Sequence, residues 1–322
     1  MRVRGFAVFV ASTFVALTWL ACGARTGLLL DDPTAKDGGS DTGGRSAELP
    51  DSGRAGSPIR DAAPDAPPDA PVVTDCANAG VTYIYLMTDQ RELLSFYPPT
   101  GAFRTIGSIA CPAVPGESPF SMAVDRSGQA YVLFTDGELF EVSTRNASCR
   151  AIPFRVGQQG FVTFGMGFAS NPGDGGETLY VDQIDHSTDT PSSGLASIDL
   201  QTYQLHYIGP FGDATLAGGE LTGTGDSQLF GYFFHLKSDG GTLLQIDRQS
   251  GKTISATQLP IGNNQSSEAF AFWGGDFYIF TSPDGGPTMV TRYSPSSAAL
   301  VTVAHRPGRV VGAGVSTCAP QH

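Results

Sequence analysis

The chain has 322 residues, including 41 glycines and 22 prolines, and only 16% of its residues are charged. This composition is rich in turn formers and poor in the residues that build long helices, which argues against a helical fold. The formal net charge of −12 opposes the approach of nucleic acid, so we expect no nucleic-acid partner.

Residues 1–21 are typical of an export signal. Arg2 and Arg4 precede an apolar run at residues 6–20, which has the length of a signal peptide and is short for a membrane span. The run ends in Trp-Leu-Ala-Cys-Gly, which resembles a lipoprotein processing box except that Trp19 stands where that family has leucine. The resemblance implies that Cys22 carries the lipid. The alternative is ordinary cleavage nearby, which would leave a free thiol.

The next residues, Cys-Gly-Ala-Arg-Thr-Gly-Leu from Cys22 to Leu28, resemble the start of myxobacterial-type surface lipoproteins. This resemblance implies a lipid-anchored protein at the outer membrane or cell surface, where each buried CH₂ of the anchor contributes about 0.8 kcal/mol. Residues 22–75 consist mainly of Asp, Pro, Ala, Gly and Ser. Such a composition cannot bury enough apolar surface to offset its ordering entropy, so we expect a disordered acidic tether.

Residues 76–322 contain a repeated pattern of bulky and small residues, which is clearest in Phe-Gly-Met-Gly-Phe at residues 164–168. Related segments begin at Phe120, Leu221, Phe270 and Val311, at intervals of roughly 40–60 residues, which favours a propeller or a similar array. Because side chains alternate across a strand, the small residues share one face. We infer that this face is crowded by its equivalents around a central axis.

Each repeat is predicted to contain four strands separated by turns. The amino-terminal end supplies only three of them, at residues 82–87, 93–96 and 103–109, and the missing first strand is found at 309–315. We therefore predict an all-β, five-bladed β-propeller, a monomer closed by strand exchange between its ends, which removes the open edge. The other expected strands are 120–124, 130–134, 138–143 and 149–154; 162–168, 178–183, 194–199 and 204–209; 220–225, 228–233, 242–247 and 253–259; and 269–273, 277–281, 288–293 and 299–304.

The sequence Leu-Ala-Ser-Ile-Asp ending at Asp199, and Leu-Leu-Gln-Ile-Asp ending at Asp247, resemble the strands of quinoprotein-like or Kelch-like repeats. We expect both aspartates to accept N–H groups of the following turns, with calcium ligation as the alternative.

Four cysteines remain besides Cys22, and they allow three pairings. Cys76 and Cys318 flank the strands that are expected to close the ring, so a bond between them would staple the closure. Cys111 and Cys149 would join neighbouring blades. Thiolate ligation of a metal is the competing role, although no Cys-x-x-Cys pair is present.

No nucleotide loop, zinc-protease helix or nucleophile elbow is present, and we predict no catalytic residue. Alignment of the inner strands places Glu220, Glu268 and Arg309 at one mouth of the channel, with Glu117 nearby. Three roles stay open: a site for a polar ligand or divalent cation, an acid/base carboxylate pair, or a structural cluster in which Arg309 neutralises the glutamates. His186 lies beside carboxylates and is either a metal ligand or part of a solvated loop.

The leading interpretation is a surface-tethered binding module for an envelope protein or a glycan. The alternative is an exported lyase, lactonase or glycoside hydrolase that uses channel carboxylates or a metal. A purely architectural envelope protein is the third possibility.

Overall fold

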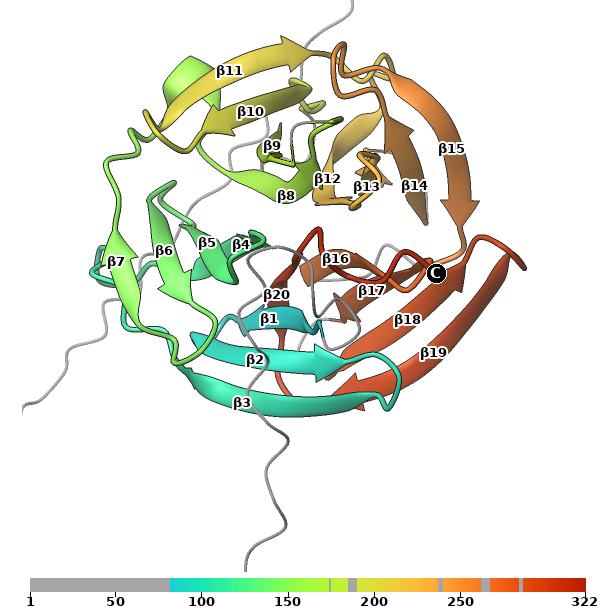
Figure 1. Ribbon diagram of the computed structural model, residues 1–322, viewed down its shortest axis with the longest axis horizontal. Coiled ribbons are helices and arrows are strands. Elements are labelled where there is room, and N and C mark those ends of the chain that lie inside the picture. Colours follow the sequence, from blue (N-terminus) through green and yellow to red (C-terminus); the bar gives the residue numbers. More distant parts are fainter. Residues whose placement is uncertain (1–81, 174, 185–189, 237–239, 262–266, 284–285) are drawn as a thin grey trace, which may run out of the picture. The chain divides into compact units, whose positions relative to one another are not determined.

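The computed structural model describes residues 82–322 except 174, 185–189, 237–239, 262–266 and 284–285. The expected signal peptide, Cys22, the tether and Cys76 lie outside these residues. The described chain is all-β apart from one short 3-10 turn, and it forms five antiparallel four-stranded sheets arranged radially around a centre (Figure 1). The predicted five-bladed propeller is therefore confirmed.

The strands of each blade follow from the inner to the outer edge of its sheet. Blade 1 contains β20 (Val310–Val315), β1 (Ile84–Thr88), β2 (Glu92–Tyr97) and β3 (Ala102–Ser108); blade 2 contains β4 (Pro119–Val124), β5 (Gln129–Phe134), β6 (Leu139–Ser143) and β7 (Cys149–Ala151); blade 3 contains β8 (Phe164–Ser170), β9 (Glu177–Gln183), β10 (Leu195–Asp199) and β11 (Gln204–Gly209); blade 4 contains β12 (Leu216–Gly223), β13 (Leu229–His235), β14 (Gly241–Ile246) and β15 (Thr253–Leu259); and blade 5 contains β16 (Ser267–Trp273), β17 (Asp276–Ser282), β18 (Thr288–Ser294) and β19 (Ala299–Arg306).

Blade 1 is completed by the two ends of the described chain. The carboxyl-terminal strand β20 pairs with β1 in antiparallel register, with Ile84 opposite Val315 and Leu86 opposite Ala313. Figure 1 shows β20 beside β1 at the centre of the ring, where β20 also lies against β4 and β16 of the two neighbouring blades. The predicted strand exchange is confirmed.

The small residues of the inner strands face the backbone of the next inner strand. A Cβ added to Gly165 would overlap the carbonyl oxygen of Gly219, and one added to Gly167 would lie 2.6 Å from the carbonyl oxygen of Leu221. Gly314 is equally close to blade 2, because a Cβ added to it would lie 2.8 Å from the backbone nitrogen of Val124. Glycine is therefore required here by the close approach of backbones around the axis, as the repeat pattern predicted.

Two strands differ from the prediction in ways that have a physical cause. Strand β12 begins at Leu216, four residues before the expected start, because Gly218 has a φ of 113° and a register shift lies between Leu216 and Gly218. Such a bulge needs glycine and extends the strand past the irregularity. Strand β7 ends at Ala151 and not at residue 154, because Pro153 has no N–H to give to a ladder.

The hydrophobic core lies between neighbouring blades and has no single centre. Between blades 4 and 5, for example, Tyr232 and Phe270 pack with their ring centroids 6.0 Å apart, and Phe270 stacks on Phe277 at 5.5 Å. Each blade therefore packs its apolar residues against both neighbouring blades.

The aspartates of the repeated turn motif have the structural role that was predicted. Oδ1 of Asp199 accepts hydrogen bonds from the backbone N–H groups of Gln201 at 2.7 Å and Thr202 at 2.9 Å. Asp247 accepts from the hydroxyl and from the backbone N–H of Ser250, each at 2.8 Å. These hydrogen bonds hold the pKa of both carboxyls below the usual range.

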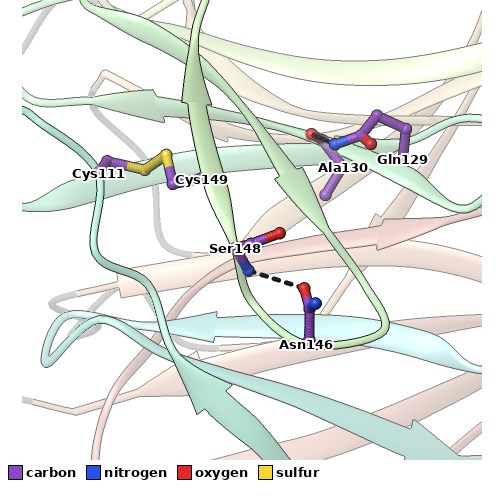
Figure 2. The surroundings of a disulfide bond; sticks show 6 residues. All are labelled: Cys111, Gln129, Ala130, Asn146, Ser148 and Cys149. Atoms are coloured by element: carbon purple, nitrogen blue, oxygen red, sulfur yellow. Dashed lines mark hydrogen bonds between the residues drawn. A yellow bond between two sulfur atoms is a disulfide. The ribbon is translucent and has the colours of Figure 1, made fainter.

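One predicted disulfide is confirmed and joins two blades. Cys111, which follows blade 1, is bonded to Cys149 at the start of β7 (Figure 2). Beside it, the backbone N–H of Ser148 donates to Oδ1 of Asn146 at 3.0 Å and tightens the turn into β7. Cys318 is also disulfide-bonded, but Cys76, its expected partner, lies outside the described residues.

Loss of this inter-blade bond should destabilise the protein. The bond closes a loop between residues 38 apart in the sequence, and chain-entropy arguments give about 4 kcal/mol for a loop of that length. We expect the double variant C111S/C149S to lose up to that amount in urea unfolding without a change of fold. Unchanged unfolding of this variant beside the parent protein would contradict a stabilising role.

Candidate functional site

Glu220 is a buried residue of β12, the inner strand of blade 4. The earlier start of β12 makes Glu220 an internal residue of that strand, and only 3% of it is exposed. The hydroxyl of Ser121 on β4 donates to Oε2 of Glu220 at 2.8 Å, although blade 3 lies between blades 2 and 4. The backbone N–H of Met166 also donates to the Glu220 carboxyl. Glu220 therefore links the inner strands of three successive blades, β4, β8 and β12.

The pKa of Glu220 is raised to about 8: burial is the largest cause, the hydrogen bonds from Ser121 and Met166 oppose it, and the carboxyl of Asp182 adds to it. At neutral pH the Glu220 carboxyl is mostly protonated and uncharged. It needs no countercharge in that state, because an uncharged acid is far cheaper to bury than a carboxylate.

Two further acids face the same region, and we name the set of Asp182, Glu220 and Glu268 the axial acid cluster. Asp182 on β9 is fully buried, and it accepts hydrogen bonds from the Ser192 hydroxyl and from the Gly219 N–H, the latter at 2.7 Å. Burial raises its pKa well above the usual value. Burial also raises the pKa of Glu268 on β16, as do the neighbouring carboxyl groups of Glu220 and Asp182 when they ionise. The prediction that Glu220 and Glu268 act on one another is consistent with this electrostatic coupling.

Three polar atoms near this cluster have no hydrogen-bond partner within the described chain: Oε2 of Glu268 and the hydroxyls of Tyr232 and Thr281. Thr281 is paired with Glu268 across β16 and β17. Burial raises the pKa of Tyr232, and the charge of Glu268 raises it as well. All three atoms are inaccessible to solvent. A protonated Glu268 supplies a donor to this group, which lowers the cost of burying it.

Arg309 and Glu117 do not complete the expected cluster. The guanidinium of Arg309 pairs with Asp89, with Nε and one terminal nitrogen each 3.1 Å from Oδ2. Glu117 accepts a hydrogen bond from the hydroxyl of Thr135 beside blade 2. The prediction that Arg309 neutralises the glutamates is therefore wrong. Burial keeps Glu220 protonated, so that carboxyl needs no cation beside it. Arg309, which directly precedes β20, instead pairs with Asp89 of blade 1.

No group of three or more His, Cys, Asp or Glu side chains in the described part of the chain is arranged to hold a metal ion. His186, the sequence-based metal candidate, lies outside the described residues. Over the same described ranges, no helix is long and apolar enough to cross a membrane.

An open cleft lies between blades 4 and 5, and we name it the interblade cleft. Its volume is about 300 Å³, at the lower end of the range of roughly 300–1,000 Å³ for small-ligand sites. Cross-strand pairing explains its blade 4 wall, because Phe230 lies opposite Gln245, and Gln245 lies opposite Ser255. Residues paired in this way share one face of a sheet, so an aromatic ring, an amide and a hydroxyl stand in one row.

The floor of the interblade cleft is aromatic and its rim is polar. Phe230 meets Phe277 edge to face at 4.8 Å, and Phe272 and Tyr293 complete the apolar part. The amide of Gln245 donates to Oε1 of Gln228 at 3.1 Å, which fixes two neighbouring amides side by side. The remaining lining residues are Thr224, Asp226, Leu243, Thr257, Gly275, Pro295 and Gln321.

Sequence reasoning missed Asp182, Ser121 and the interblade cleft. Asp182 ends a run of buried residues on β9, and an acid inside an apolar strand was the available signal. The Ser121–Glu220 contact joins residues 99 apart and had no local signal. Finding the cleft required the register of β13, β14 and β15. That register places Gln245 and Ser255 on a blade face that otherwise carries apolar residues.

No family model matches this chain, and none of the curated proteins matches its sequence. Among solved structures, hydrazine synthase of Kuenenia stuttgartiensis is similar, with 13% identity, a TM-score of 0.41, and coverage of 68% of this chain and 64% of that one. The Dos1 propeller has 12% identity and a TM-score of 0.37, with 73% and 56% covered. The nidogen/laminin complex has 10% identity and a TM-score of 0.43, with 74% and 99% covered. The chain therefore spans less than two thirds of the length of hydrazine synthase and of the Dos1 propeller.

Proposed function

We propose that this chain is an exported protein, anchored at the outer membrane or cell surface through a lipid on Cys22, that presents its β-propeller as a binding module. The support for anchoring is the charged start, the apolar run and the Cys-Gly-x-Arg-Thr-Gly-Leu segment. The observation that carries the binding role is the interblade cleft, which opens to solvent and is lined by aromatic and polar side chains on a rigid scaffold.

Lipid attachment is tested by growing the producing cells with an alkyne-labelled fatty acid and following the label on the protein. We expect the parent chain to be labelled and membrane-bound, and the variant C22S to be unlabelled and released. The variant C111S is the matched control, because it removes a cysteine of the folded domain and should keep its label. Equal labelling of the parent and C22S would refute the anchor at this residue.

The second candidate is an exported lyase, lactonase or glycoside hydrolase that uses the axial acid cluster. Its support is the pKa of Glu220, raised to about 8, since a carboxyl that is protonated at neutral pH can act as a general acid. We favour binding because Glu220 is only 3% exposed and its carboxyl already links β4, β8 and β12. Turnover of a glycoside or lactone panel that disappears in E220Q, with the fold retained, would reverse this choice.

A further inference from the structure

We propose that the interblade cleft binds an uncharged saccharide, held by the amide–hydroxyl row of blade 4 over an aromatic floor. This inference rests on the proposed binding function and names its ligand class. Gln245 and Ser255 are the residues that we expect to recognise the sugar hydroxyls, and Phe230 with Tyr293 is expected to meet the C–H face of the ring.

The chemistry of the cleft selects against charged ligands. Among the described residues that line it there is no Lys or Arg, and the one charged residue is Asp226, whose carboxylate accepts from the Gln228 amide at 2.6 Å. An anionic sugar or phosphate would meet a carboxylate with no compensating cation, within a chain of net charge −12. A cation would find only this single carboxylate, which is already hydrogen-bonded. An uncharged ligand avoids both costs.

The polar groups are of the kind that sugars use. Amides carry both donors and acceptors, and each hydroxyl does both, so a row of Gln228, Gln245 and Ser255 can match a ligand with several adjacent hydroxyl groups. Ser255 and Thr257 are exposed, whereas Gln245 is half-buried and held by its bond to Gln228. The row is therefore preorganised, which reduces the ordering cost of binding.

The aromatic floor supplies the apolar part of sugar recognition. The electron-rich faces of aromatic rings attract weakly positive C–H groups, and one face of a pyranose ring presents such groups. Phe230 is partly exposed at the floor, and its ring is fixed by the edge contact with Phe277. A peptide is less well suited, because β13, β14 and β17 are paired along both edges and offer no free backbone groups for an added strand.

The test uses the full chain in a detergent without a sugar headgroup, titrated with glucose and N-acetylglucosamine oligomers by calorimetry. We expect saturable binding of at least one series. We also expect an affinity loss of tenfold or more in Q245L and in S255A, the second being a surface change that spares the core. Q204L is the matched control, because Gln204 is exposed on β11 of another blade, and it should bind like the parent.

Three results would overturn the saccharide assignment. The first is that no neutral oligomer binds. The second is that both cleft variants bind the oligomers as tightly as the parent. The third is that a charged ligand or a peptide binds more tightly than any of these sugars and loses affinity in Q245L. The last result would keep the binding module and change its ligand class. If the protein binds none of these probes and no peptide or envelope glycan, the proposed binding function itself is refuted.

Discussion

Replacing Gly165 with alanine should destabilise the protein by about 3 kcal/mol, because a Cβ at this position overlaps the backbone of the neighbouring blade. The added atom would meet the carbonyl oxygen of Gly219 and would lie 3.0 Å from Cα of Glu220. Neither is the end of a flexible side chain, so a whole inner strand would have to move. The gain from a less flexible unfolded chain, about 0.4–1 kcal/mol, does not offset this cost.

The measurement is urea unfolding of G165A beside G107A. Gly107 lies on the outer strand β3, where an added Cβ would be 3.2 Å from Cβ of Ala147, a contact that a shift of a few tenths of an ångström relieves. We expect G107A to change the free energy of unfolding by less than about 1 kcal/mol. Similar stabilities of the two variants would show that the inner strands do not approach as closely as described.

The second large effect concerns pH. The folded state raises the pKa of Glu220 from its usual 4.5 to about 8, so the folded protein holds a proton that the unfolded chain releases. The stabilisation from this group is therefore full below pH 4.5 and is lost as the pH rises toward 8. Linkage sets the slope at about 1.4 kcal/mol per pH unit for one fully coupled proton. Asp182 and Glu268, whose pKa values are also raised, act in the same direction.

The variant E220Q should remove the contribution of one titrating proton from the pH dependence of stability. Glutamine keeps the size of the side chain, and its amide oxygen can accept from Ser121 and Met166 as the protonated acid does. We expect the free energy of unfolding of E220Q to fall less steeply between pH 5 and 8, by about 1.4 kcal/mol per unit, in a series of urea titrations. E92Q, a change in the partly exposed ion pair with Arg306, is the control for loss of one carboxyl group. Identical slopes for the parent and E220Q would contradict the burial of an uncharged Glu220.

The sequence was sufficient for the architecture because the architecture leaves a local signature. Close approach around the axis requires small residues, and strand alternation places a bulky residue between them, as Met166 stands between Gly165 and Gly167. The terminal strand exchange was readable for the same reason, since β20 carries this signature and the amino-terminal strands do not. Cys111 and Cys149 were paired correctly once the blades were in order.

The candidate site was only partly readable. The sequence made Glu220 the first residue of its strand, but β12 begins four residues earlier and contains a bulge at Gly218, so Glu220 lies within the strand. Arg309 was assigned to the glutamates on charge alone, but protonation of a buried acid removes the need for a cation, and Asp89 took the guanidinium. The interblade cleft depends on cross-strand register, which a sequence read along one strand does not contain.

The central claim is that β20 completes the sheet begun by β1, and a disulfide trap tests it most directly. Leu86 and Ala313 are cross-strand partners, so L86C/A313C should form a bond under mild oxidation that peptide mass spectrometry can locate. L86C/A123C, which places the second cysteine on the inner strand of blade 2, should not. The account predicts the first crosslink in the folded protein. Its absence, or an equally efficient second crosslink, would contradict a ring closed by its carboxyl-terminal strand.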